Sequence, residues 1–303
     1  MFRYDSVLVT GGSGRLGQAV VKELNNFCAV STIDCAPAAF ELPHGVVDIL
    51  DLPALYKAMK GHDAVVHIAA IDSHTKAAPE EFFKTNALGT WNVLHAAYEA
   101  GVRKVVVCSS NAATGLNFSN KQRPPLYLPY DENHPLHPTA AYGLSKQITE
   151  VAAQSFANRG KMEVICLRPS YVAFSDIVRL MVARVQEPER AHFPWMADGE
   201  YLEPLQLLRS YILPEDVARC FRLALQATGI QYDVFFVSAA DTFDTTPTLL
   251  HIEKTYGKPP EIRKPWIYER NPYASVTDCA RARDRLGWEP TTDWATLAGI
   301  KRA

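Results

Sequence analysis

The sequence lacks any run of lysine or arginine, and its formal net charge of −2 is close to neutral. We therefore do not expect a nucleic acid or an anionic membrane to be its main partner. Long hydrophobic stretches are also missing, because the longest apolar runs, such as residues 64–71, are far too short to cross a bilayer. The first twelve residues enter a strand-like run with no charged-then-apolar leader.

The six cysteines are scattered along the chain without a C-x-x-C pair. Cys108 and Cys166 lie inside apolar runs, which is typical of small core residues. We therefore expect no disulfide framework, no metal site and a reduced, cytoplasmic protein. Internal repeats and low-complexity segments are absent as well.

Short apolar runs alternate with segments of helical periodicity over the first 170 residues. Such runs predict strands that are buried on both faces, at residues 6–10, 29–33, 63–69, 104–110 and 163–169. Helices are predicted between them, at residues 14–26, 82–101 and 143–160. Alternating strands and helices form a parallel sheet with helices on both faces. The sequence therefore predicts a doubly wound α/β fold of the Rossmann type.

The pattern changes after residue 172. Residues 173–212 contain few strand signals, whereas residues 232–240 form another apolar run that we expect to return to the main sheet. A helix is predicted at residues 214–227, with proline at its first turn and two acidic residues near its positive end. We predict a nucleotide-binding domain and a smaller C-terminal, substrate-binding cap. Their predicted bounds are residues 1–172 plus about 213–241 for the domain, and 173–212 plus 242–303 for the cap.

Three glycines, Gly11, Gly14 and Gly17, stand directly between the first predicted strand and the first predicted helix. Glycine at a strand-to-helix turn lets the backbone approach a pyrophosphate at the helix N-terminus. A glycine pattern alone is weak evidence, but this one has the flanking strand and helix that a dinucleotide site requires. The turn therefore predicts a bound dinucleotide.

An acidic residue, Asp34, ends the second predicted strand. A carboxylate at this place accepts hydrogen bonds from the adenosine ribose and repels a 2′-phosphate, which favours NAD over NADP. Arg15, in the glycine turn, has the opposite tendency, because a guanidinium attracts that phosphate. Arg15 can equally lie on the pyrophosphate or in solvent, so we expect NAD.

A tyrosine and a lysine four residues apart, Tyr142 and Lys146, would share one face of a helix. Tyr56 and Lys60 have the same spacing. The spacing is therefore compatible both with an acid and the cation that tunes it and with a solvated helix face. The surroundings of each pair have to decide.

Several motifs occur in the order found in one enzyme superfamily. The chain resembles the short-chain dehydrogenase/reductase superfamily in its G-x-x-G-x-x-G turn and in HIAA (67–70), NALG (86–89), SSNAATG (109–115) and YGLSK (142–146). Residues 209–218 (RSYILPEDVA) and 283–290 (RDRLGWEP) narrow the resemblance to the extended branch, the NAD-dependent epimerase/dehydratase family. The resemblance covers nearly the whole chain. It also implies a homodimer formed through helices at 80–100 and 143–158.

The family uses a serine, a tyrosine and a lysine together, and the matching residues are Ser110, Tyr142 and Lys146. Taking hydride from a secondary alcohol also requires removal of the hydroxyl proton, and free tyrosine, with a pKa of about 10, is a poor base at neutral pH. The Lys146 ammonium and a positive nicotinamide both favour the phenolate of Tyr142. Ser110 would orient the substrate oxygen. Tyr56 and Lys60 have no serine at a strand end, so we interpret them as a solvated helix face.

The resemblance also implies which residues contact NAD. Asp48 matches the position near the adenine, the backbone at Ala69 and Ala70 should lie along the cofactor, and Lys146 should bond the nicotinamide ribose. His67 is interpreted as a packing residue. The full predicted set is Gly11, Gly14, Arg15, Leu16, Asp34, Asp48, Ile49, Ala69, Ala70, Asn86, Tyr142 and Lys146.

Two kinds of substrate remain open. Arg209 and Arg270 resemble the arginines with which nucleotide-sugar 4-epimerases hold a diphosphate, but the asparagine usual after the L-R strand is missing. Sugar-acid dehydrogenases resemble the chain in Asn111, which would donate to a substrate carboxylate, and more loosely in Ser170 and Arg179. An arginine fork on a carboxylate would give orientation as well as charge, although Arg179 can equally be a solvated helix residue.

We therefore predict an NAD-dependent oxidoreductase that acts on a secondary alcohol or ketone of a sugar or sugar acid. The alternative is a nucleotide-sugar 4-epimerase with bound NAD. Dehydratase chemistry is disfavoured, because the resemblance implies that it needs an acidic pair just after the serine, where Asn111 and Ala112 stand. A third reading, a regulator that binds NAD without catalysis, is disfavoured because Tyr142 and Lys146 are both present.

Overall fold

The computed structural model of the chain describes residues 2–39, 41–116, 124–186, 208–300 and 302. Its centre is a sheet of seven parallel strands in the order β10-β7-β5-β4-β1-β2-β3. The strands are β1 (Ser6–Thr10), β2 (Ala29–Asp34), β3 (His44–Val46), β4 (Ala64–His67), β5 (Lys104–Cys108), β7 (Glu163–Pro169) and β10 (Tyr232–Val237). The order reverses between β1 and β4, and ligands of open α/β sheets bind at the carboxyl ends of the strands beside such a switch.

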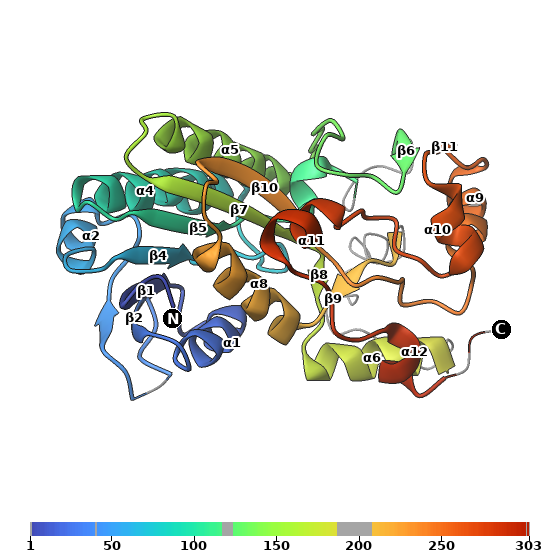
Figure 1. Ribbon diagram of the computed structural model, residues 1–303, viewed down its shortest axis with the longest axis horizontal. Coiled ribbons are helices and arrows are strands. Elements are labelled where there is room, and N and C mark those ends of the chain that lie inside the picture. The colour runs from blue at the N-terminus through green and yellow to red at the C-terminus, as the bar shows by residue number, and fades with distance from the viewer. Residues whose placement is uncertain (1, 40, 117–123, 187–207, 301, 303) are drawn as a thin grey trace.

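Helices cover both faces of this sheet (Figure 1). One face carries α2 (Leu52–Ala58), α4 (Gly89–Glu99) and α5 (Ala141–Ala157). The opposite face carries α1 (Arg15–Leu24), α8 (Pro214–Gln226) and α11 (Ala280–Leu286). Strand β1 is buried on both sides, because Val7 and Val9 pack in the α1 and α8 core while Leu8 packs in the α2 and α4 core. The prediction of a doubly wound Rossmann-type fold is confirmed.

The apolar runs predicted the main strands well. Strands β1 and β7 have the predicted bounds, and β10 returns to pair with β7, with Tyr232 opposite Val164. The sequence did not predict β3, and it indicated α2 only through the helix face assigned to Tyr56 and Lys60, of which Tyr56 packs against the core. Strand β3 has only three residues, none of them buried, so it has no apolar run. Among the described residues, no helix is both long and apolar enough to cross a bilayer.

A smaller part of the molecule lies beside the sheet, on the right of Figure 1. It contains two short strand pairs, β6 (Tyr127–Leu128) with β11 (Glu261–Ile262) and β8 (Tyr171–Val172) with β9 (Tyr211–Ile212). Its helices are α6 (Ser175–Gln186), α9 (Thr248–Tyr256), α10 (Pro265–Arg270) and α12 (Trp294–Ala298). One of its two cores packs Trp294 edge-on against Tyr211 and Phe243. The division into two domains at the stated residues stays a prediction.

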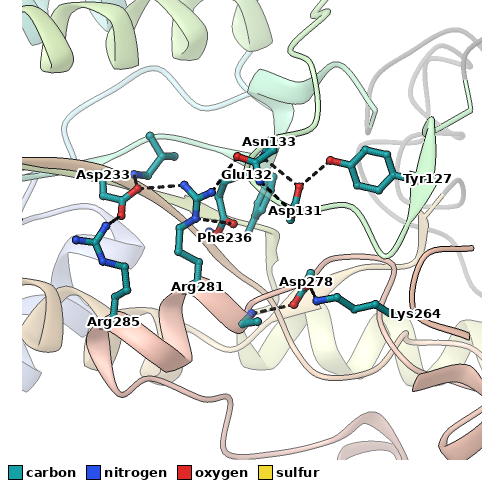
Figure 2. A network of polar contacts seen from close by, with 12 residues as sticks. Tyr127, Asp131, Glu132, Asn133, Asp233, Phe236, Lys264, Asp278, Arg281 and Arg285 are labelled. Atoms are coloured by element: carbon teal, nitrogen blue, oxygen red, sulfur yellow. Dashed lines mark hydrogen bonds and ion pairs between the residues drawn. The ribbon is translucent and has the colours of Figure 1, made fainter. Parts of the chain in front are cut away.

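A polar cluster, which we call the α11 joint, connects α11 to the edge of the sheet (Figure 2). Arg281 and Arg285 both pair with Asp233 of β10, at 3.1 Å for Arg281. Arg281 Nε also lies 3.3 Å from Glu132 Oε2, and Glu132 Oε1 accepts the N–H of Phe236 at 2.8 Å. Burial raises the pKa of Glu132 to about 7, against the opposing effects of that N–H and of Arg281. The joint therefore holds a carboxyl group that titrates near neutral pH.

Candidate functional site

The structure brings the predicted catalytic residues and all of the predicted cofactor residues except Asn86 into one cavity of about 770 Å³. Volumes of this size are typical of small-molecule sites. The predicted residues that line it are Gly11, Gly14, Arg15, Leu16, Asp34, Asp48, Ile49, Ala69, Ala70, Ser110, Tyr142, Lys146, Ser170 and Arg209. The predicted residues that are not among its lining are Asn86, Asn111, Arg179 and Arg270.

The glycine turn between β1 and α1 leaves no room for a side chain at Gly11 or at Gly17. Gly11 has a φ of +75°, and a Cβ there would lie 2.6 Å from the backbone nitrogen of Ala69. A Cβ on Gly17 would lie 1.9 Å from the carbonyl oxygen of Gly11. Gly14 precedes α1 and has no side chain to cap it, so the first N–H groups of α1 remain for a ligand. The turn therefore fits the pyrophosphate of a dinucleotide.

Asp34, at the end of β2, lies against this turn. Its Oδ2 accepts the N–H of Ser13 at 3.0 Å, and its Oδ1 accepts the N–H of Ala36 at 3.1 Å. Each carboxylate oxygen has a second lone pair, which remains for a ribose hydroxyl. Asp48 lies further along the same cavity, next to the buried Ile49. These positions suit the predicted adenosine half of the site.

Ser110, Tyr142 and Lys146 converge from different elements. Ser110 follows β5 and caps a short 3₁₀ turn, η2 (Asn111–Thr114), whereas the tyrosine and the lysine lie on the first turns of α5. A hydrogen bond joins the hydroxyl groups of Ser110 and Tyr142. Lys146 Nζ donates to the carbonyl oxygen of Cys108 at 2.9 Å and lies 5.8 Å from the ring centroid of Tyr142. The geometry is that of a phenol with a hydroxyl partner and a nearby cation.

Burial controls the protonation of this group. It raises the pKa of Tyr142 above its ordinary value, an effect that the Ser110 hydrogen bond opposes and the carboxylate of Asp72 reinforces. Burial also lowers the pKa of Lys146. The protein groups alone thus do not produce the lowered phenol pKa that a base at neutral pH needs. A further positive charge in the cavity would be needed to reach it.

A buried ion pair holds α5 beneath the site. Arg168 of β7 donates to both carboxylate oxygens of Glu150 in α5, at 2.8 and 2.7 Å. The hydroxyl of Ser109, the residue before Ser110, donates to Glu150 at 2.6 Å. Glu150 lies one helical turn beyond Lys146, so these bonds fix the helix face that carries the lysine.

Asn86 does not line the cavity but hydrogen-bonds residues next to it. It lies in a π-helical turn, η1 (Phe83–Leu88), between α3 (Pro79–Phe82) and α4. Its amide bonds both backbone groups of Ile71, at 2.7 and 3.0 Å, and donates to Ser145 Oγ at 3.1 Å. Asn86 therefore fixes the cavity loop that begins at Ile71, and its contact with NAD stays a prediction.

His67 is buried and bridges Thr10 and Thr90, with ring nitrogens 2.7 and 2.9 Å from their hydroxyl oxygens. Burial, reinforced by the charge of Lys146, lowers its pKa to about 3, so the ring is neutral at physiological pH. These contacts agree with its interpretation as a packing residue.

The predicted substrate residues are only partly brought together. Ser170 Oγ is buried at the cavity and has no hydrogen-bond partner among the described residues. Arg209 lines the cavity, with its Nε 3.4 Å from Asp244 Oδ2. Arg179 and Arg270 are exposed on their helices.

Asn111 is buried, and its amide is already used. Its Nδ2 donates to the hydroxyl of Tyr130 at 2.9 Å, and its Oδ1 accepts from that hydroxyl at 3.2 Å. A second interaction of Oδ1, with Thr114, measures 3.5 Å. The predicted contacts of Asn111, Arg179 and Arg270 with substrate therefore stay untested predictions.

Sequence reasoning did not anticipate several lining residues. Asp72 and His74 follow β4, and Tyr171 and Phe174 follow β7. His74 packs edge-on against Tyr171, with ring centroids 5.6 Å apart. All four come shortly after strands whose carboxyl ends face the site, so the strand-end argument used for Ser110 could have found them.

The chain matches the family model described as the NAD dependent epimerase/dehydratase family over residues 7–237. This span is more than two thirds of the chain and includes the glycine turn, the catalytic group and β10.

Individual proteins of known activity are also similar. The chain is 28% identical to L-arabinose 1-dehydrogenase (NAD(P)(+)) from Haloferax volcanii, over 69% of this chain and 84% of the relative. It is 28% identical to UDP-glucose 4-epimerase from Streptomyces lividans, over 94% of this chain and 91% of the relative. A solved structure, MoeE5 in complex with UDP-glucose and NAD, superposes with a TM-score of 0.71 at 22% identity, covering 97% of this chain and 96% of that chain.

Proposed function

The chain belongs to the NAD-dependent epimerase/dehydratase family, and from this premise we propose that it is an NAD-dependent dehydrogenase that oxidises a secondary hydroxyl group of a sugar or sugar acid. NAD as cofactor follows from the family. The observation that carries the proposal is one cavity lined by both the glycine turn and the group of Ser110, Tyr142 and Lys146.

The proposed chemistry divides the work among three side chains. When bound, NAD supplies the hydride acceptor and a positive charge. The Lys146 ammonium stabilises the phenolate form of Tyr142, and this phenolate accepts the proton of the substrate hydroxyl group and becomes the neutral phenol. Ser110 hydrogen-bonds the substrate oxygen and keeps it within reach of the phenol. The apolar walls of the cavity, such as Ile68 and Ile71, limit water around these groups.

The arrangement of cations favours a net dehydrogenase over a nucleotide-sugar epimerase. Holding a diphosphate by the expected route needs two convergent arginines, but Arg270 is exposed and is not among the cavity lining. Arg209 does line the cavity, but Asp244 offsets its charge. The epimerase remains the second candidate, because an epimerase relative aligns with 94% of this chain.

The polar groups beside the catalytic group suit the hydroxyl groups of a sugar. The buried Ser170 hydroxyl can bond one of them, and Asp72 can accept from another. The negative charge of Asp72 raises the pKa of Tyr142, which indicates that the Asp72 carboxylate lies near the phenol. An acid group on the substrate is therefore expected away from Asp72.

A substrate screen tests the proposal. The purified protein is mixed with NAD and with free sugars, sugar acids, lactones and nucleotide sugars, and absorbance of reduced nicotinamide is followed. We expect stoichiometric accumulation of reduced nicotinamide with one free sugar or sugar acid. Interconversion of nucleotide-sugar epimers without net reduction would overturn the dehydrogenase in favour of the epimerase.

Two arginine variants refine the outcome. Arg209→Ala should strongly raise KM for a nucleotide sugar, because each charge-assisted contact contributes roughly 1.5–3 kcal/mol, and should change turnover of a free sugar acid little. Arg179→Ala should matter only if the substrate carries a carboxylate. Equal effects of both variants on one free sugar would contradict this assignment.

A homodimer is also proposed. Four large apolar side chains, Leu88, Trp91, Leu144 and Val151, are exposed on the η1–α4 segment and on α5, which pack against each other. Exposed apolar patches of this kind are typical of interfaces. Light scattering after size-exclusion chromatography should give twice the chain mass, and Val151→Lys should shift it towards the monomer. A monomeric wild type would refute the dimer.

A further inference from the structure

Arg15, the first residue of α1, is the only predicted cofactor residue with a cationic side chain in the glycine turn. The sequence left its role open between a 2′-phosphate, the pyrophosphate and solvent. In the structure its Nη2 pairs with Oδ1 of Asp176, and its guanidinium carbon lies 4.0 Å from the ring centroid of Phe174. Phe174, which lines the cavity, directly precedes α6, and Asp176 lies in the first turn of that helix.

The carboxylate of Asp176 is well suited to keep this contact. Asp176 lies in the first turn of the twelve-residue helix α6, where the positive end of the helix dipole favours a negative charge. The hydrogen bond from Arg15 lowers the pKa of Asp176, so the group is charged at neutral pH. Both side chains are about half exposed, and exposed pairs contribute little to stability. What the pair determines is the direction of the guanidinium group.

That direction bears on the choice of cofactor. Asp34, which is expected to bond the adenosine ribose, accepts the N–H of Ser13, only two residues before Arg15. Asp34 and Arg15 line the same cavity. A released Arg15 side chain is therefore near enough to reach a phosphate on that ribose, where a guanidinium would bind it bidentately.

We propose that Asp176 is a specificity-determining residue, which favours NAD by holding Arg15 on the α6 side of the cavity and withholding it from a 2′-phosphate. Two carboxylates then disfavour NADP by different routes. Asp34 repels the phosphate directly, and Asp176 removes the cation that would attract it. This inference rests on the cofactor part of the proposed function and does not depend on the substrate.

The test measures cofactor binding without any substrate. Dissociation constants for NAD and NADP are determined by calorimetry for the wild type, Asp34→Ala, Asp176→Asn and the double variant. Asp176→Asn should tighten NADP binding about tenfold, as expected for one charge-assisted contact, and should change NAD binding much less. The double variant should gain more for NADP than the two single variants combined, because the phosphate then meets a free guanidinium and no opposing carboxylate.

Two further variants make the interpretation specific. Adding Arg15→Ala to Asp176→Asn should remove the gain for NADP. Glu261→Gln, which breaks a similarly exposed pair with Arg263 outside the cavity, should bind both cofactors as the wild type does.

Three results would overturn the inference. Equal changes in the dissociation constants of NAD and NADP in Asp176→Asn would show that the ion pair only connects α6 to the glycine turn and does not select the cofactor. A gain that survives Arg15→Ala would show that loss of negative charge, and not release of Arg15, is responsible. No gain at all in a variant whose melting temperature is unchanged would show that Arg15 does not reach the phosphate. Because these measurements contain no substrate, they can be interpreted even if the protein proves to have no dehydrogenase activity.

Discussion

Two segments of the chain have a tyrosine and a lysine four residues apart, and the structure treats them very differently. In the first, Tyr56 lies on α2 and packs edge-on against His95, with ring centroids 5.8 Å apart, while Lys60 is exposed beyond the end of the helix. In the second, Tyr142 bonds Ser110 and Lys146 is buried at the cavity. The spacing is identical, but only one pair meets a strand end.

The difference lies in what surrounds each helix. Helix α5 starts at the carboxyl edge of the sheet and is held by the buried pair of Glu150 and Arg168. In α2 the pair comes at the other end of the helix, with Tyr56 near its last residue and Lys60 beyond it, and the first turn is capped by Asp51, whose Oδ1 accepts the N–H of Ala54 at 3.0 Å. The same four-residue pattern thus becomes a reactive group or part of a packed surface according to the strand end that it faces.

Removing each tyrosine hydroxyl gives the largest expected difference. Tyr142→Phe should lower kcat by about 10²–10⁴-fold, because it deletes the proposed proton acceptor. NAD affinity should remain nearly unchanged. Tyr56→Phe is the matched control and should have wild-type kinetics. A Tyr142→Phe variant that keeps half of its activity would place the base elsewhere.

Breaking the pair beneath α5 should cause the next largest effect. Glu150→Gln leaves the buried Arg168 without its counter-charge, so the free energy of unfolding in urea should fall by about 3–5 kcal/mol. Asp284→Asn, in the exposed pair with Arg283, is the control and should change it by less than about 0.5 kcal/mol. Similar values for both variants would show that α5 is not held in this way.

Substitutions of Lys146 and Lys60 should also differ in their effect on kcat/KM. Lys146→Met should lower kcat/KM by about 10²-fold, because the phenolate loses its nearby cation, whereas Lys60→Met should have no effect. Burial lowers the pKa of Lys146, so the ammonium is lost as pH rises through a value below that of an ordinary lysine. The wild type should therefore lose kcat/KM earlier on the alkaline side than a normal lysine predicts. A pH profile unchanged in Lys146→Met would contradict this role.

The smallest expected effect concerns Glu132, which should change the pH dependence of stability without changing that of catalysis. The folded-state pKa of Glu132, about 7, lies above its ordinary value of 4.5. Its contribution to stability is therefore fully present below pH 4.5 and is lost as pH rises through 7. Relative to Glu132→Gln, the wild type should lose a few degrees of melting temperature between pH 5 and pH 8, while the pH profile of kcat/KM stays the same in both. An unchanged difference in melting temperature would mean that Glu132 is charged throughout.

The sheet and the cofactor turn could be predicted from sequence because their signals are local. An apolar run such as residues 163–169 is long enough to define a buried strand, and the glycine spacing fixes a strand-to-helix turn. Two-residue strands such as β8 and β9 have no such pattern, because a distant partner defines them.

The substrate side could not be predicted in the same way. The amide of Asn111 donates a hydrogen bond to the hydroxyl of Tyr130, nineteen residues further along the chain. Nothing near Asn111 in the sequence indicates this bond. The pairing of Arg15 with Asp176 joins residues 161 positions apart. Side-chain direction at such places depends on which remote segment arrives there, and a local motif contains no information about that.

The α11 joint has a consequence for how the chain is made. Translation delivers Glu132 and then Asp233 well before Arg281 and Arg285, so the two acids emerge without the guanidinium groups that later neutralise them. Strand β10 is the edge strand of the sheet, and an uncovered edge is prone to pair with other chains. A chain stalled on the ribosome before α11 would therefore carry a nearly finished sheet whose last strand is unsecured. Arg281 and Arg285 thus secure the edge strand from a segment that follows every strand of the main sheet in the sequence.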